Sequence, residues 1–311
     1  MANGRVPFVS SERIPRDQIG YFYDARLPAV LSVDPGATVV FETQDARGGA
    51  MFVHPVGELV DLPRPPVGRG NPVTGPLEVR GARPGDALIV DVLDIQTISP
   101  GWCGGHAHMG PLAEGRIPRA RGRVCAVGDG AVTFSSSIRL DEQPMIGCIG
   151  IAPVGDAISC GTPGRHGGNL DHKVIGRGAR VYLPVNQPGA LLWIGDVHAT
   201  QGDGELSGTA MEIGADVTVR VDVAAGLTID APWIETADRL MSTGASVDFA
   251  TARRDAIEGM MRALERQLGL EPAEALALIS AAADLRVGQA FGGMELTLRL
   301  EVPRSLGLRP A

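Results

Sequence analysis

This chain of 311 residues predicts a mostly β protein with a pair of helices near its C-terminus, an α+β fold. Its 42 glycines and 23 prolines separate many short runs that are rich in Val, Ile and Thr, a composition typical of short strands joined by tight turns. Two long runs, 215–223 and 294–302, alternate apolar and polar residues as half-buried strands do. Only the stretch from about residue 249 to 284 carries apolar residues at helical spacing.

The strands of the first two thirds of the chain follow a recurring turn. Pro-Gly precedes an apolar run in 34–41, 83–90 and 187–194, and this dipeptide suits the two central positions of a type II turn. The spacing between the three segments is irregular, so we interpret them as recurring turn chemistry and not as structural repeats. Further strands are expected over 124–127, 131–134 and 180–183.

Two helices are predicted late in the chain. The first covers about 249–268, where one apolar stripe comprises Ile257, Met260, Met261, Leu264 and Leu268. Asp248 is placed to cap its start and Gly269 its end. A second helix is expected over 273–284, with Pro272 at its first helical position.

No segment marks a clear domain boundary. The Gly- and Pro-rich segments 62–76 and 161–168 are expected to run over the surface as linkers. Residues 1–311 are therefore expected to form a single domain, or two closely packed β subdomains.

Composition narrows the range of partners. The net charge is −8 and no block of Lys and Arg occurs, so we expect no nucleic-acid partner. No segment is apolar enough to span a membrane and the first residues lack a signal peptide, which favours a soluble, cytoplasmic protein. The four cysteines are scattered without a Cys-x-x-Cys pair, so neither a disulfide framework nor a thiolate zinc site is indicated.

The most informative stretch runs from residue 195 to 212, where an apolar strand leads into Gly195-Asp196-Val197-His198 and then into Asp203 and Glu205. Alternate residues of a strand share a face, so Asp196 and His198 should point the same way. Buried near the core, such groups need a partner or a metal ion. The alternative is a solvent-exposed acidic turn.

Three weaker candidates accompany this stretch. In the glycine-rich segment 161–173, Gly168 and Asn169 could bind an anion or a carbonyl oxygen and Asp171 a cation; an Asx turn is the alternative. Asp45 ends another apolar strand and is either a ligand or solvated. His106 and His108 could start a zinc site, although their glycine-rich surroundings favour a loop.

Lys173 is the single lysine of the chain. Hydrolases that use a Ser-Ser-Lys or Cys-Glu-Lys set would therefore have to use this residue. The run Ser135 to Ser137 is tempting as the serine partner, but serine clusters commonly end strands. No Gly-x-Ser-x-Gly motif occurs either.

Several long motifs resemble the acetamidase/formamidase family. They occur in order from about residue 30 to 300 and comprise Gly75-Pro76, Gly81-Ala82-x-Pro84-Gly85-Asp86, Gly147-Cys148-Ile149-Gly150-Ile151-Ala152-Pro153, Gly167-Gly168-Asn169-Leu170-Asp171, Gly195-Asp196-Val197-His198-x-x-Gln201-Gly202-Asp203-Gly204-Glu205 and Gly208-Thr209-Ala210. The resemblance implies a β-sandwich-like hydrolase that cleaves small carboxamides to acid and ammonia. It also implies a homo-oligomer, a dimer or larger, and a divalent metal. The pair His106 and His108 departs from the family pattern.

When the candidate residues are assigned to these motifs, the hypothesis is a metal-dependent amidase. His198, Asp196, Asp171 and Asp45 would hold the metal, Glu205 or Asp203 would transfer the proton, and Asn169 with Gly168 would bind the substrate oxygen. Oxygen-rich ligands with one histidine suit zinc first, with calcium or manganese as alternatives. A metal-free amidase using Lys173 or an Asp/Glu base, and a non-catalytic metal- or ligand-binding β module, remain as alternative interpretations.

Overall fold

The computed structural model describes residues 12–65, 68–106, 113–291 and 295–311. Strands dominate it. In chain order they are β1 (Glu12–Ile14), β2 (Ile19–Gly20), β3 (Phe22–Tyr23), β4 (Leu31–Val33), β5 (Thr38–Thr43), β6 (Leu59–Asp61), β7 (Val73–Val79), β8 (Ala87–Gly105), β9 (Arg121–Gly128), β10 (Ala131–Thr133), β11 (Arg139–Asp141), β12 (Met145–Ile151), β13 (Ile158–Ser159), β14 (Gly167–Asn169), β15 (Arg180–Pro184), β16 (Leu192–His198), β17 (Glu212–Ala224), β18 (Trp233–Glu235), β19 (Arg239–Ser246), β20 (Asp284–Val287) and β21 (Leu296–Pro303). The helices are α1 (Ala113–Arg116), α2 (Phe249–Leu268), α3 (Pro272–Ala282) and a 3-10 turn, Arg304–Leu306.

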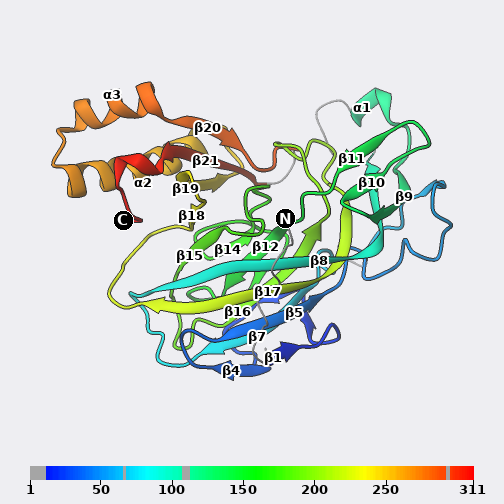
Figure 1. The fold of residues 1–311 in the computed structure, drawn as a ribbon, viewed down its shortest axis with the longest axis horizontal. Coiled ribbons are helices and arrows are strands. Elements are labelled where there is room, and N and C mark those ends of the chain that lie inside the picture. Colours follow the sequence, from blue (N-terminus) through cyan, green and yellow to red (C-terminus); the bar gives the residue numbers. More distant parts are fainter. Residues whose placement is uncertain (1–11, 66–67, 107–112, 292–294) are drawn as a thin grey trace, which may run out of the picture.

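One large, mainly antiparallel sheet organises the molecule. Within the described residues, nineteen strands join a single hydrogen-bonded network. The long strands β8 and β17 pair along most of their lengths, and β17 also pairs with β5 and β16. Figure 1 shows the helices α2 and α3 beside one another at one end of this sheet. The predicted mostly β fold with a helical pair near the C-terminus is confirmed.

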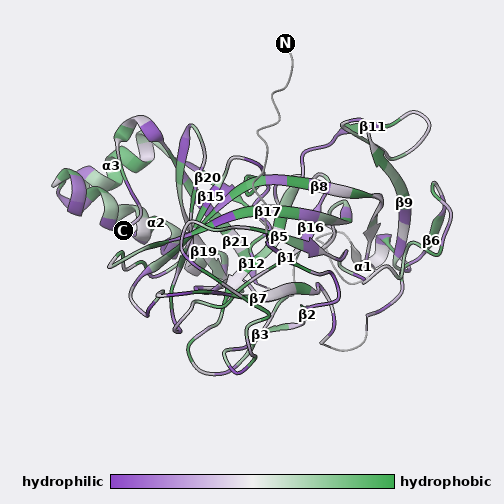
Figure 2. Ribbon diagram, turned by 60° about the horizontal axis from the view of Figure 1, so that its bottom comes forward, coloured by the Kyte–Doolittle hydropathy of each residue, from purple (hydrophilic) through white to green (hydrophobic). Residues whose placement is uncertain are grey.

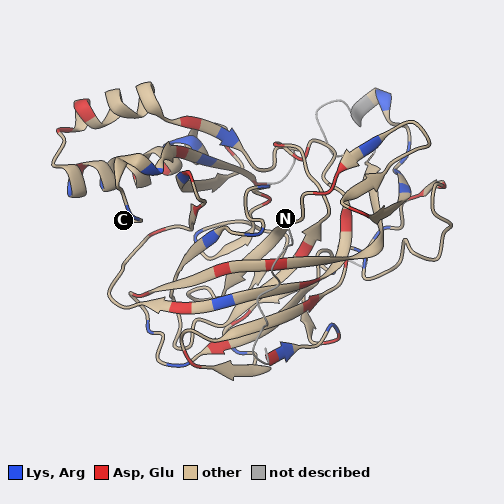
Figure 3. Ribbon diagram, viewed as in Figure 1, with Lys and Arg blue, Asp and Glu red and all other residues tan. Residues whose placement is uncertain are grey.

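The main hydrophobic core lies between the central strands. Its buried members include Phe41 of β5, Leu77 of β7, Val90 of β8, Ile194 of β16 and Val217 of β17. Figure 2 shows hydrophobic stretches along these central strands, whereas Figure 3 shows acidic and basic residues interspersed over strands, helices and loops. None of the described helices has the length and apolarity that crossing a bilayer requires.

The Pro-Gly turns have the predicted conformation. Gly36, Gly85 and Gly189 all adopt positive φ, at 87°, 96° and 75°, as the third residue of a type II turn requires. The three turns directly precede β5, β8 and β16, where the sequence predicts strands. The local sequence therefore determines where three of the central strands begin.

The helical pair packs against the far end of the sheet. Asp248 accepts a hydrogen bond from the Thr251 backbone at 2.8 Å, and Gly269 ends α2 in the left-handed conformation. Both caps are as predicted. Helix α2 packs on β19, where a Cβ at Gly244 would collide with the backbone of Ala252 and lie 2.8 Å from the nitrogen of Ala256. A glycine at this position lets helix and sheet approach closely.

Two segments predicted to be surface linkers instead contain buried strands. Residues 73–76 belong to β7, and residues 167–168 belong to β14. The glycines that suggested loops allow strands to pack tightly: a Cβ on Gly75 would lie 2.7 Å from the carbonyl oxygen of Leu192 and 2.8 Å from the Trp193 ring. The prediction of a linker over these residues is wrong because the glycines here allow neighbouring strands to pack closely.

Candidate metal centre and substrate cavity

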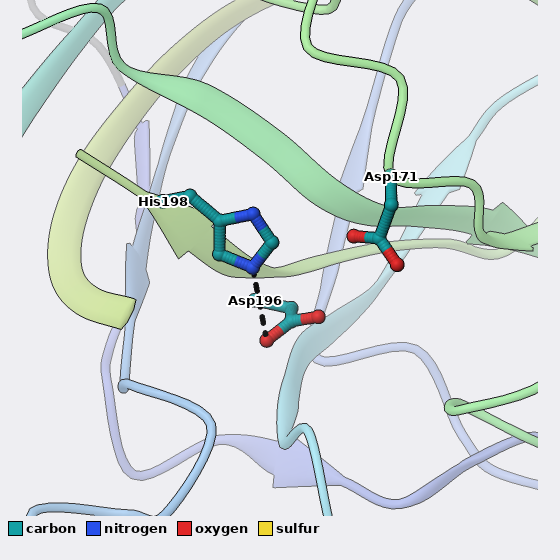
Figure 4. Close-up of side chains that lie close together, drawn as sticks. All are labelled: Asp171, Asp196 and His198. Atoms are coloured by element: carbon teal, nitrogen blue, oxygen red, sulfur yellow. Dashed lines mark ion pairs between the residues drawn. The ribbon is translucent and has the colours of Figure 1, made fainter. Parts of the chain in front are cut away.

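The end of β16 carries the pair that the sequence singled out. Asp196 and His198 are almost fully buried, and the His198 Nε2 atom lies 3.7 Å from an Asp196 carboxylate oxygen. Figure 4 shows both side chains turned toward the same space, with Asp171 approaching from a neighbouring loop. The two groups thus share one side of the strand, as the period of two predicts.

Two further acids complete the cluster. Glu212, at the start of β17, is the cross-strand partner of His198, and its carboxylate lies 3.4 Å from the Nε2 atom. Glu205 comes from the loop between β16 and β17. Asp171, Asp196 and His198 each offer one potential ligand atom, and these three atoms lie within 4.8 Å of one another. The same is true of a second group, His198, Glu205 and Glu212. We call these five residues the acid cluster.

The orientation of His198 is fixed by its neighbours. Its Nδ1 atom lies 2.7 Å from Gln201 Oε1, while Gln201 Nε2 donates to the carbonyl oxygen of Asp171 at 2.6 Å. Because the Gln201 amide nitrogen is already the donor to that carbonyl, its oxygen accepts the proton of Nδ1. The other ring nitrogen, Nε2, faces the carboxylates, 3.4 Å from Glu212, and would bind a cation in place of its own proton.

The atoms that face the centre of the cluster lack partners. Four of them are buried without a hydrogen bond: Asp171 Oδ1, Asp196 Oδ1, His198 Nε2 and Glu212 Oε2. Gly147 forms the floor beneath them, since a Cβ there would lie 2.6 Å from Asp171 Oδ1. Buried polar atoms without partners are costly, and one nitrogen with several carboxylate oxygens is a donor set that fits a divalent cation.

Burial and mutual repulsion shift the protonation of these groups. Burial, followed by the charges of neighbouring acids, raises the pKa of Asp171 to about 7. Burial and the charge of Asp171 hold the pKa of Glu205 well above its ordinary value. Burial alone would lower the pKa of His198, but the carboxylates around it outweigh this effect and raise it well above the ordinary value. Without a cation, the cluster therefore retains protons.

Backbone strain is concentrated at the same place. Asp171, Asp196 and Glu205 have φ values of 48°, 52° and 40°, in the left-handed region that non-glycine residues rarely adopt. Such a conformation costs roughly 1 to 3 kcal/mol per residue and tends to cluster at functional sites. The fold thus holds these three acidic residues in strained backbone conformations that direct their side chains toward one point.

Asn169 lies beside the cluster and supports it. Its Nδ2 atom donates to Asp171 Oδ2 at 2.7 Å and to Gln289 Oε1 at 2.9 Å, and its Oδ1 atom accepts from Asn71 at 3.2 Å. Both of its donors are thus engaged, so its amide orients Asp171. Gly168 lies in β14, paired with Ile149 of β12, and does not line the cavity described below.

Other predicted site residues lie outside the cluster. The Asp45 carboxylate accepts hydrogen bonds from the Trp102 ring and from the backbone of Arg47 and Gly49. Asp203 is held by Arg299 at 3.0 Å and by Lys173 at 3.3 Å. His106 lines the cavity but is not part of either potential ligand group, and His108 lies outside the described residues.

Sequence reasoning missed Glu212 and Gln289. Glu212 was included in the informative stretch but given no role, although an acid between Met211 and Ile213, at the start of a strand, is a recognisable signal of a buried charge. Gln289 is fully buried and donates to the carbonyl oxygen of Glu295 while accepting from Asn169. Nothing in its local sequence indicates this role.

A cavity of about 780 Å³ leads to the acid cluster. Asn71, Asn169, Asp196, Glu205 and Glu212 line one part of it. The rest of its lining includes the segment 61–65, residues 118–120, Arg47 and His106. The cluster is therefore buried on the protein side and accessible to a small molecule on the cavity side.

The chain is similar to proteins of one family over nearly its whole length. The acetamidase/formamidase family profile matches residues 16–159 and 154–304. The crystal structure of an acetamidase from Bacillus halodurans is 35% identical, with a TM-score of 0.89, covering 95% of this chain and 98% of that one. The crystal structure of an acetamidase from Yersinia enterocolitica is 29% identical, with a TM-score of 0.87, covering 97% of this chain and 94% of that one.

Curated relatives match less completely. An acetamidase from Mycolicibacterium smegmatis is 27% identical, and the match covers 64% of this chain and 64% of the relative. The chain spans less than two thirds of the length of the curated relatives it matches. The matches to the family profile nevertheless span both halves of the sheet and every residue of the acid cluster. This chain belongs to the acetamidase/formamidase family.

Proposed function

We propose that this protein is a metal-dependent hydrolase that cleaves the C–N bond of a carboxamide to give an acid and ammonia. The observation that carries the proposal is the convergence of four buried potential ligand atoms, none of which has a hydrogen bond, at the end of a cavity. Membership of a family with members named acetamidase and formamidase supports the reaction class.

The residues that would hold the metal are His198, Asp196, Asp171 and Glu212. When bound, a divalent ion polarises a carbonyl oxygen and lowers the pKa of a water molecule. Zinc suits the histidine and the compact donor set, and manganese or calcium would suit the oxygen-rich remainder. Glu212 takes the position that the sequence assigned to Asp45, because the Asp45 carboxylate already accepts three hydrogen bonds.

Glu205 is the residue we assign to proton transfer. It lines the cavity, lies within the acid cluster and has a pKa held well above its ordinary value by burial. A carboxyl group with a raised pKa is a stronger base than an ordinary carboxylate, and it can accept a proton from water and donate it to the leaving nitrogen. Asp203, which is tied to Arg299 and Lys173, is less suited to this role.

Ammonia release from a panel of amides, measured together with metal content, tests the proposal. We expect His198→Ala to lose the metal and to lower turnover by roughly 10²- to 10⁴-fold, the range of a single catalytic contribution. His54→Ala removes an imidazole outside the cluster and serves as the matched control, with metal content and turnover unchanged. Full turnover by chelated enzyme would exclude a role for the metal. No ammonia from any amide, together with a melting temperature that falls on metal removal, would favour a binding module.

A further inference from the structure

One wall of the cavity carries a positive charge that has no ion-pair partner among the described residues. Arg47 is half-buried on this wall, its guanidinium stacked over the Trp102 ring at 5.8 Å. Its Nε atom is buried without a hydrogen-bond partner. Within the described residues, no carboxylate lies within ion-pairing distance of Arg47. A guanidinium in this setting lacks the partner that buried charges normally have.

The acid closest in sequence to Arg47 is unavailable to it. Asp45 accepts hydrogen bonds from Trp102 Nε1 at 2.9 Å, from the Arg47 backbone at 3.0 Å and from the Gly49 backbone at 2.5 Å. Its two oxygens are directed to the turn and to the indole that supports Arg47. Asp45 thus positions the arginine without pairing with its charged end.

The acid cluster does not serve as the partner either. The charges of Glu212 and Asp196 reach Arg47 and partly offset the effect of burial, which lowers the pKa of the guanidinium. None of these carboxylates contacts it directly, however, and a divalent ion in the cluster would neutralise them. With a metal ion in place, Arg47 would remain in the cavity as a cation without a partner.

A second unpartnered group lies close to this cation. The Nε2 atom of His106 is buried without a hydrogen bond and the residue lines the same cavity. Burial, with the nearby charge of Arg47, lowers the pKa of His106 to about 4, so the imidazole is neutral at neutral pH. A neutral N–H beside a guanidinium fork suits a planar anion with more than one acceptor oxygen.

We propose that the substrates of this protein carry a carboxylate in addition to the amide and that Arg47 binds this carboxylate. The favoured class is monoamides of short dicarboxylic acids, with the amide at the acid cluster and the carboxylate at Arg47. This inference rests on the proposed amide hydrolysis and specifies its substrate. A cavity of about 780 Å³ lies in the range that holds ligands much larger than formamide or acetamide.

The test compares two amides of equal chain length, succinamate and butyramide, which differ in the terminal carboxylate. We expect the wild-type, metal-loaded enzyme to prefer succinamate in kcat/KM by roughly 10- to 100-fold, the scale of a charge-assisted pair. Arg47→Met should reduce this preference by a similar factor, chiefly through KM for succinamate. Arg47→Lys, which keeps the charge but not the fork, should retain part of the preference.

Arg139→Met is the matched control, because Arg139 is an exposed arginine of β11 that does not line the cavity. It should leave the preference close to that of the wild type. An equal loss in Arg47→Met and Arg139→Met, or a wild-type enzyme that prefers butyramide, would overturn the proposal.

Binding of the two products separates this inference from the proposed function. Calorimetric titration with succinate and with butyrate requires no turnover, and succinate should bind the wild type more tightly than it binds Arg47→Met. If no amide is hydrolysed but this difference holds, the reaction is wrong and the anion site stands. If amides are hydrolysed but succinate binds both proteins equally, the anion site is wrong and the hydrolase stands.

Discussion

The carboxyl group of Asp171 would link the proposed metal binding to pH. Its raised pKa of about 7 in the metal-free protein means that, below this pH, an ion must displace a proton to use its oxygen. We expect zinc affinity to fall as the pH decreases through about 7 and to level off above it. Calorimetric titration of zinc at several pH values, in buffers of different ionisation enthalpy, measures both the affinity and the protons released.

Asp171→Asn provides the control for this pH dependence. The amide cannot titrate, so zinc affinity should be weaker at high pH and should depend less on pH near 7. A pH profile identical to that of the wild type would show that other groups of the cluster account for the linkage.

At the level of residues, the sequence identified the members of the acid cluster that follow a local rule. Asp196 and His198 could be paired because alternate residues of a strand share a face. Glu212 reaches the same point through the register of β17 on β16, which depends on pairing that a single sequence does not display. The hydrogen bonds that occupy the side chains of Asp45 and Asn169 likewise depend on Trp102 and Gln289, which are remote in the chain.

At the level of elements, predictions succeeded where the determinants were local. Helix α2 could be bounded because Asp248 and Gly269 act on the backbone next to them. Strand β7 was misassigned because its glycine and proline resemble a loop, whereas its contact with Leu192 and Trp193 of β16 requires a residue without a side chain. Contacts between strands distant in sequence decide such cases.

The contact between α2 and β19 allows a direct test at this scale. A methyl group at Gly244 would collide with the backbone of α2, so Gly244→Ala should destabilise the fold by about 1 to 3 kcal/mol, as overpacking does. Chemical denaturation followed by circular dichroism measures the free energy of unfolding. In Gly128→Ala the added Cβ meets no atom within 4 Å, so that variant should unfold within about 0.5 kcal/mol of the wild type.

At the scale of the whole molecule, an ion that binds the folded state stabilises it by mass action. At a free concentration about 100 times its dissociation constant, the gain is about 2.7 kcal/mol. We expect a chelator to lower the melting temperature of the wild type by several degrees and to leave His198→Ala almost unchanged. An equal shift in both proteins, measured by calorimetry with excess chelator, would place the stabilising ion elsewhere.

The separation in sequence between the acid cluster and Arg47 has a consequence for the evolution of specificity. The acid cluster comes from residues 171 to 212, whereas Arg47 and the neighbouring wall segment 61–65 come from a much earlier part of the chain. Selection can therefore alter the early segment while the acid cluster stays in place. Exchanging this wall between relatives would be a route to new substrate ranges on an unchanged reaction centre.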